Sequence, residues 1–123
     1  MAKILVIDDD PALREMIRQM LERAGYEVAE ADNGAAGMAA FRTEPADLVV
    51  TDIVMPDQEG IETIVEFRKE FPDVKIIAMS GGGRTGNVDF LTLAKKFGAE
   101  RTFAKPVDRR EFLQAVADCV GTA

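Results

Sequence analysis

The most informative absence in this chain of 123 residues is histidine, of which it has none. Without an imidazole, the protein cannot assemble a Ser-His-Asp or Cys-His nucleophile, offer imidazole to a metal ion or carry a phosphoryl group on histidine. Chemistry at any site must therefore come from carboxylates, hydroxyls or lysine. The single cysteine, Cys119, cannot form a disulfide within the chain, and its apolar neighbours indicate a small buried residue in a reducing compartment.

The chain also lacks an excess of positive charge and long apolar runs. Its 15 Lys and Arg against 22 Asp and Glu give a net charge of −7, so neither a nucleic-acid backbone nor an anionic membrane surface is an expected partner. The apolar run over 4–7 stops at three aspartates and is too short for a signal peptide or a membrane span. No repeat or linker divides the sequence. We expect one cytoplasmic domain over 1–123, acting as a monomer.

Short apolar runs alternate with segments of helical period along the chain. The predicted strands are 4–7, 26–29, 48–50, 74–79 and 102–104. The predicted helices are 11–24, 35–41, 61–71, 88–97 and 108–120. The first helix has Asp10 as its N-cap, Pro11 at its first position and Gly25 at its stop. Alternating strands and helices predict a parallel sheet covered on both faces, which is a three-layer α/β sandwich.

Polar side chains follow four of the five predicted strands. Asp8 and Asp9 follow the first strand, Asp52 the third, Ser80 the fourth and Lys105 the fifth. Because the carboxyl ends of parallel strands lie at one edge of a sheet, we expect these side chains to converge. Clustered carboxylates repel one another unless a hard cation binds them, and Mg²⁺ prefers carboxylate and carbonyl oxygens. An aspartate in such a site can act as a nucleophile toward phosphorus, and Asp52 has that position.

Four short motifs stand at these strand ends. They are Ile7-Asp8-Asp9-Asp10, Val50-Thr51-Asp52-Ile53-Val54-Met55-Pro56 with Gly60, Met79-Ser80-Gly81 and Ala104-Lys105-Pro106. Each motif alone is weakly diagnostic, but their ordered combination resembles the receiver domain of bacterial two-component response regulators, over essentially the whole chain. The resemblance implies a flavodoxin-like fold with five helices and five parallel strands in the order 2-1-3-4-5.

The resemblance also implies an acceptor and a metal site. Asp52 resembles the phosphoacceptor of the family. Asp9, Asp52 and the main-chain carbonyl of Val54 resemble the direct Mg²⁺ ligands, and Asp8 would act through a water. Asp10 is interpreted as a helix cap only.

Two further residues resemble the switch machinery of the family. Ser80 resembles the hydroxyl that turns toward the phosphoryl group, and Lys105 resembles the ammonium that pairs with it. The resemblance implies a donor, which is a phosphohistidine on a sensor kinase or phosphotransfer protein, and a downstream protein target. The protein is expected to be a regulator that assists its own phosphorylation and dephosphorylation, and not an enzyme.

The sequence departs from the family pattern in its switch region. Many receivers carry an aromatic residue three positions before the strand-five lysine, and here that position is Thr102. Phe103 is expected on the opposite face of the strand, because neighbouring residues of a strand alternate between faces. We therefore expect output to depend on the glycine-rich loop 80–87, and a variant with a shortened loop that binds partners equally well would contradict this. Arg84 in that loop is a candidate phosphate contact, although exposed loop arginines are commonly only solvated.

Three other functions fit the sequence less well. A receiver-like interaction module that is not phosphorylated would be expected to lack one of the acidic, hydroxyl or lysine residues, and all are present. A phosphohydrolase resembling the haloacid dehalogenase family needs a second acid two residues after the nucleophile, but this chain has Val54 there. Such an enzyme also needs an insertion that caps the substrate, and this chain has no insertion long enough for one. A nucleotide-binding P-loop is excluded, because the glycine-rich loop lacks the Gly-Lys-Ser/Thr ending.

Overall fold

A computed structural model describes residues 2–53, 59–80, 90–104 and 107–120, and within them strands and helices alternate. The strands are β1 (Lys3–Ile7), β2 (Glu27–Ala31), β3 (Leu48–Asp52), β4 (Ile76–Ser80) and β5 (Arg101–Ala104). The helices are α1 (Pro11–Arg23), α2 (Gly34–Thr43), α3 (Glu59–Glu70), α4 (Phe90–Phe97) and α5 (Arg109–Val120). In the described ranges, no helix combines the length and the apolar character that crossing a bilayer requires.

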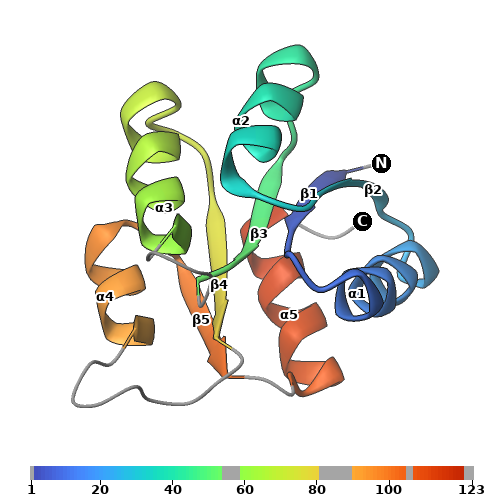
Figure 1. The fold of residues 1–123 in the computed structure, drawn as a ribbon. Helices are drawn as coiled ribbons and strands as arrows, with labels where there is room; N and C mark the ends of the chain where they lie inside the picture. Colours follow the sequence, from blue (N-terminus) through green and yellow to red (C-terminus); the bar gives the residue numbers. More distant parts are fainter. Residues whose placement is uncertain (1, 54–58, 81–89, 105–106, 121–123) are drawn as a thin grey trace.

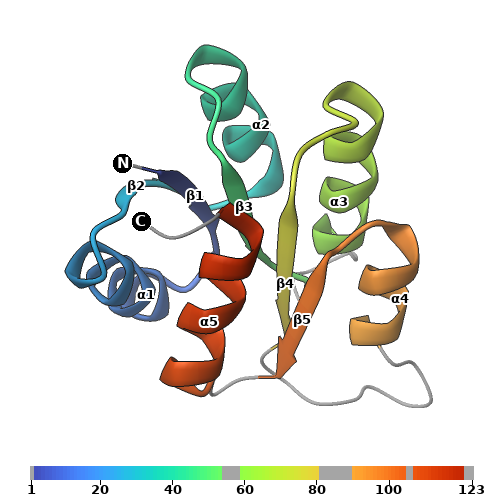
Figure 2. The ribbon, with the colours of Figure 1, turned by 180° about the vertical axis from the view of Figure 1, so that it is seen from behind.

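The strands form a single parallel sheet in the order β2-β1-β3-β4-β5 (Figure 1), which confirms the predicted class and strand order. Helices α1 and α5 cover one face, and α2, α3 and α4 cover the other, as the view from behind also shows (Figure 2). Since every strand runs in the same direction, all five carboxyl ends lie at one edge of the sheet.

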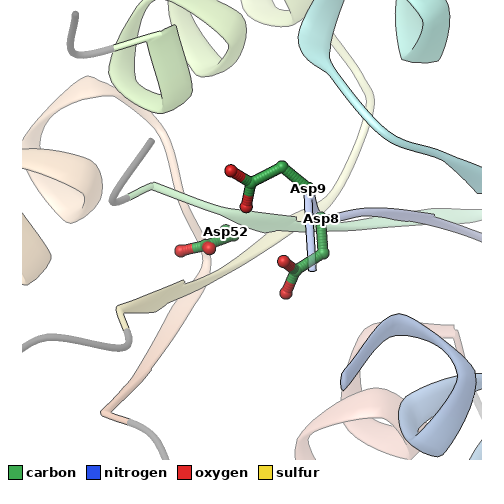
Figure 3. A group of neighbouring side chains, drawn as sticks. All are labelled: Asp8, Asp9 and Asp52. Carbon is green, nitrogen blue, oxygen red and sulfur yellow. The ribbon is translucent and has the colours of Figure 1, made fainter. Parts of the chain in front are cut away.

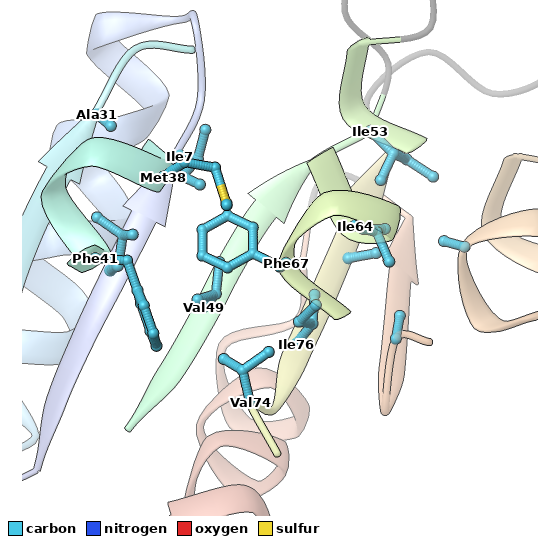
Figure 4. Close-up of a cluster of buried hydrophobic side chains, with 14 residues drawn as sticks. Ile7, Ala31, Met38, Phe41, Val49, Ile53, Ile64, Phe67, Val74 and Ile76 are labelled. Atoms are coloured by element: carbon cyan, nitrogen blue, oxygen red, sulfur yellow. The ribbon is translucent and has the colours of Figure 1, made fainter. Parts of the chain in front are cut away.

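Each face of the sheet has its own hydrophobic core, because successive residues of a strand point to opposite sides. Leu5 and Ile7 of β1 pack with the core under α2, α3 and α4, which Figure 4 shows, whereas Ile4 and Val6 pack with the core under α1 and α5. The first core includes a cluster of aromatic rings. Its ring-centroid separations are 5.4 Å for Phe41–Phe67, 4.5 Å for Phe41–Phe71 and 6.1 Å for Phe67–Phe71.

The first helix begins and stops as its sequence predicts. Asp10 caps it by accepting hydrogen bonds from the main-chain N–H groups of Ala12 (3.0 Å) and Leu13 (3.3 Å), and Pro11 is its first residue. Gly25 has a φ of 98°, a left-handed conformation that glycine adopts without steric cost. The chain leaves the helix there in a Schellman turn.

The fourth predicted strand starts two residues too early. Its expected range is 74–79, but β4 begins at Ile76, and the N–H of Val74 donates to the carbonyl of Phe71 in a turn (3.0 Å). Val74 is buried in the core all the same. Buried residues are apolar in turns as well as in strands, so the apolar run alone could not show where the strand begins.

The other boundaries within the described residues differ from the expectations by at most two residues. The strand β2 begins at Glu27 and extends to Ala31, and α2 extends beyond 35–41 at both ends. The side chain of Asn33 caps α2 through the N–H of Ala36 (2.8 Å), a start signal that apolar periodicity does not include. The described part of the fourth helix begins at Phe90, so its predicted start at 88 lies outside the described residues.

Candidate functional site

Three aspartates converge at the carboxyl edge of the sheet. Asp8 and Asp9 directly follow β1, Asp52 is the last residue of β3, and these two strands are neighbours. One carboxylate oxygen from each aspartate lies within 4.8 Å of the others, and Figure 3 shows the side chains grouped where the two strands end. The structure thus brings together acids that are 43 residues apart in the sequence, as the strand-end argument predicts.

The three carboxylates differ in exposure to water. Asp8 is fully buried, Asp52 is 4% exposed, and Asp9 is exposed. Two unit negative charges about 5 Å apart repel by roughly 3 kcal/mol at an effective dielectric constant near 20. Burial of two of the three carboxylates reduces the screening by water, so this edge of the sheet favours a positively charged ligand.

The donor set fits a hard divalent cation. All three side chains offer carboxylate oxygens, which suit hard cations such as Mg²⁺, Ca²⁺ and Mn²⁺. Mg²⁺ takes its oxygens at about 2.0–2.1 Å and keeps several waters, so it needs only a few protein ligands on one side. Asp8, Asp9 and Asp52 could hold such an ion.

Hydrogen bonds fix the position of Asp8 on three sides. Its N–H donates to the carbonyl of Ala31 in β2 (3.1 Å), and its Oδ1 accepts the N–H of Asp10 (2.9 Å). Its main-chain carbonyl accepts a hydrogen bond from Nη1 of Arg14 on α1 (2.7 Å). Asp10 itself directs its carboxylate to the first turn of α1, in agreement with its interpretation as a cap.

Ser80 lies at the same edge of the sheet on the next strand. It is the last residue of β4 and is 4% exposed. Its neighbour Met79 is the register partner of Asp52, and the carbonyl of Met79 accepts the N–H of Ile53 (2.8 Å), which joins the two strand ends. The hydroxyl that the sequence predicts as part of the site is therefore on the strand adjacent to Asp52.

Three predicted site residues lie outside the described residues. They are Val54, Arg84 and Lys105, and the loop 81–87 is also outside this range. Their proposed contacts with a metal ion or a phosphoryl group stay predictions.

The missing aromatic at Thr102 is not replaced by its neighbour. Thr102 is the register partner of Ala78, which belongs to the core under α2, α3 and α4. Phe103 packs with the opposite core, edge to face against Phe112 of α5, with 5.8 Å between ring centroids. The expectation that Phe103 lies on the other face is confirmed.

Sequence reasoning missed two residues that touch the acidic site. In the sequence, Arg14 is one of the polar residues of α1, and no local pattern predicts its hydrogen bond to a main-chain carbonyl six residues earlier. Thr51 is fully buried and donates its hydroxyl to the carbonyl of Asp52 (3.1 Å). A hydroxyl within an otherwise apolar strand was the only signal for Thr51.

Comparisons with known proteins show the family to which the chain is similar. Residues 4–117 match the sequence model of the response regulator receiver domain. The chemotaxis protein CheY of Thermotoga maritima is 35% identical over 115 residues, which cover 93% of each chain. The receiver domain protein of Clostridium thermocellum, a solved structure, superposes with a TM-score of 0.87 at 33% identity, over 98% of this chain and 94% of that one. The resemblance that the strand-end motifs indicate is confirmed.

Some relatives are much longer than this chain. The DNA-binding transcriptional regulator NtrC of Azospirillum brasilense is 36% identical over 115 residues, which are 94% of this chain and 23% of NtrC. The chain thus spans about a quarter of the length of several curated regulators that it matches.

Proposed function

The chain belongs to the response regulator receiver domain family, and from this membership we propose that Asp52 is the residue that accepts the phosphoryl group. The family consists of regulators of two-component systems and not of conventional enzymes. The observation that carries the proposal is the carboxylate of Asp52 at the end of β3, grouped with two further carboxylates at the edge where the strands end.

The transfer needs a nucleophilic carboxylate, and its proposed donor is a phosphohistidine on a sensor kinase or phosphotransfer protein. One oxygen of Asp52 forms a new P–O bond while the P–N bond to the donor imidazole breaks, which leaves an acyl phosphate on Asp52 and a neutral imidazole after proton uptake. The lack of histidine in this chain is consistent with an acceptor that receives phosphoryl groups from another protein.

Asp9, Asp52 and the main-chain carbonyl of Val54 would hold Mg²⁺ directly, and Asp8 would bind it through a water. When bound, the ion neutralises charge on the phosphoryl oxygens. The surroundings of the two acids support a direct role for Asp9 and an indirect role for Asp8. Asp9 is exposed, whereas Asp8 is buried and accepts the N–H of Asp10 at its Oδ1.

Two residues would then sense the phosphoryl group. Ser80, buried at the end of β4, would donate its hydroxyl to a phosphoryl oxygen, and Lys105 would pair with another. Arg84 is a further candidate contact. These groups would assist the domain in its own phosphorylation and dephosphorylation. The added charge shifts the population of surface conformations, which changes the binding of a downstream protein target.

The net charge of the domain bears on where it acts and what it contacts. We propose that it acts in the cytoplasm as a monomer and contacts neither nucleic acid nor membrane, which its net charge of −7 supports. A receiver-like module without phosphorylation is disfavoured, because the three acids are all present and lie together.

Intact-mass measurement tests the acceptor directly. Wild type and Asp52→Asn are incubated with Mg²⁺ and a small acyl-phosphate donor, and then with a phosphorylated histidine phosphotransfer protein. Wild type should gain one phosphoryl group, and the gain should vanish in Asp52→Asn and after chelation of Mg²⁺. An unmodified wild type with both donors, or an equally modified Asp52→Asn, would overturn the proposal.

A further inference from the structure

The guanidinium of Arg14 joins the acidic turn to a neighbouring strand. Its Nη1 donates to the main-chain carbonyl of Asp8 at 2.7 Å, and its Nε donates to Oε1 of Glu30 on β2 at 3.0 Å. We propose that Arg14, held by Glu30, is a positioning residue that sets the cation affinity of the site formed by Asp8, Asp9 and Asp52. The inference rests on the proposed function, because it assumes that these acids bind Mg²⁺.

The hydrogen bond from Arg14 acts on the peptide group that joins Asp8 to Asp9. The carbonyl of Asp8 lies in that peptide plane, so a donor fixed against it limits the rotation of the plane. The direction in which the side chain of Asp9 points depends on this rotation. On the opposite side, the N–H of Asp8 is fixed by the carbonyl of Ala31 in β2. The main chain of Asp8 is thus held at both its N–H and its carbonyl, and Arg14 makes its contact through a side chain that mutation can remove.

Glu30 makes Arg14 a rigid support. A guanidinium is planar, and its donors point in fixed directions, so an ion pair at Nε also orients Nη1. The side chains of Arg14 and Glu30 are 20% and 31% exposed, so water screens this pair less than an ion pair in open solvent. Hydrogen-bond partners behind metal ligands typically change metal affinity about 10–100-fold when they are removed.

A positioning role and a purely electrostatic role of Arg14 predict opposite changes in Mg²⁺ affinity when the residue is removed. The positive charge of Arg14 repels a cation, so its removal alone would strengthen Mg²⁺ binding by Coulomb's law. If Arg14 instead positions the acidic turn, its removal weakens binding, since the carboxylates then lose their fixed geometry. The direction of the change in affinity therefore separates the two roles.

Arg18 provides a matched control on the same helix. It lies one turn beyond Arg14, carries the same charge, and pairs with the same Glu30 through Nε and Oε2 (3.5 Å). Its Nη2 also pairs with Glu15 (3.2 Å). Replacing Arg18 by methionine removes one charge and one partner of Glu30, while the bond from Arg14 to Asp8 stays in place. Methionine is a good helix former, so α1 keeps its propensity.

The test is calorimetric titration of the purified chain with MgCl₂. The dissociation constant should rise about tenfold or more in Arg14→Met and stay within about twofold of wild type in Arg18→Met. Arg14→Lys keeps the charge but not the planar fork, and its dissociation constant should rise about threefold. As a second readout, hydrogen exchange of the Asp10 amide, which donates to Asp8, should become faster in Arg14→Met and not in Arg18→Met.

Each outcome decides the inference. Unchanged or tighter Mg²⁺ binding by Arg14→Met overturns it, and so does an equal loss in Arg18→Met. If thermal melting shows that Arg14→Met does not fold, Arg14→Lys decides, and wild-type affinity in that variant overturns the inference. If wild type itself binds no Mg²⁺, the proposed metal site fails and the inference fails with it. Mg²⁺ binding by wild type without any effect at Arg14 leaves the proposed function intact and removes only the inference.

Discussion

Arg68 of α3 donates two hydrogen bonds to a single main-chain oxygen, the carbonyl of Gly98 at the end of α4. The bonds come from Nε (3.1 Å) and Nη2 (2.5 Å), and Nη1 also donates to the carbonyl of Pro72 (3.0 Å). Gly98 has a φ of 131°, and a Cβ at this position would lie 2.6 Å from Nε of Arg68. The turn between α4 and β5 is therefore joined to α3 by a contact that needs glycine on one side and a guanidinium on the other.

Substitution Gly98→Ala should destabilise the domain by about 1–3 kcal/mol, because alanine is strained at this φ and its methyl group overlaps the Arg68 side chain. Urea unfolding measures the loss. In an Arg68→Ala background, the same substitution should cost less, since only the backbone strain remains. Equal costs in the two backgrounds would show that the steric contact has no energetic role.

Substitution Gly37→Ala should also destabilise the protein, although alanine favours helices. Gly37 of α2 lies against β1, and a Cβ there would lie 2.4 Å from Cδ1 of the fully buried Ile7. We expect a net loss of about 1 kcal/mol, because overpacking at about 1–3 kcal/mol outweighs the helix-propensity gain of about 1 kcal/mol.

The matched background for this prediction is Ile7→Val, which removes the Cδ1 atom. In that background Gly37→Ala should cost less in thermal or urea unfolding, since the propensity gain remains, the contact with Cδ1 is gone and only the 2.9 Å contact with the Cγ1 position is left. A substitution that destabilises both backgrounds by the same amount would contradict the steric explanation.

Asp9 and Asp10 should respond differently to the same change. Asp9→Asn removes a carboxylate from the acidic cluster, and we expect Mg²⁺ affinity to fall about tenfold or more, because ligand charge sets the affinity of such sites. Asp10→Asn removes the same charge but keeps a good helix cap, so both stability and affinity should stay near wild type. Calorimetric titration with MgCl₂ compares the two, and similar losses would mean that only net charge matters.

Asp10→Ala separates the capping role from metal binding. Loss of the cap should lower stability by about 1 kcal/mol while Mg²⁺ affinity changes no more than it does in Asp10→Asn. The free energy of unfolding in urea and a Mg²⁺ titration on the same sample provide the two values. A large loss of affinity in Asp10→Ala would assign Asp10 to the metal site.

Cys119 should make the protein less stable in alkali. The structure places Cys119 half-buried against the core under α1 and α5, not fully buried as its apolar neighbours predicted. This partial burial raises the pKa of its thiol above the ordinary value of 9.0, and the nearby Glu100 adds to the effect. The unfolded chain therefore loses this proton at lower pH than the folded chain does. The stabilisation is complete below about pH 9 and is lost as the pH rises through the folded-state pKa.

Unfolding in urea between pH 8 and pH 10.5 measures this dependence, with Cys119→Ala as the control for lysine and tyrosine titration. Wild type should lose more stability than the variant across this interval. Alkylation by iodoacetamide at pH 8 should also be slower in the folded protein than in urea, since less thiolate is present. Equal pH dependence in wild type and Cys119→Ala would contradict the raised pKa.

Much of the fold and of the site was predictable because the signals are local or follow from topology. Alternation of apolar runs and helical periods predicted the parallel sheet, and a parallel sheet necessarily brings its carboxyl ends to one edge. From this, the convergence of Asp8, Asp9 and Asp52 followed without knowledge of any side-chain geometry. Ser80 at the end of β4 followed in the same way.

Residue type and short-range spacing suffice to predict the layer order, the cap of α1 and the acids at the strand ends. Three features emerge only in the folded protein: Arg14 binds the carbonyl of Asp8, Arg68 binds the carbonyl of Gly98, and Val74 lies in a turn. The first two contacts join a side chain to a main-chain carbonyl in another part of the fold, and backbone carbonyls have no sequence signature. Which carbonyl each arginine binds depends on how the helices pack on the sheet.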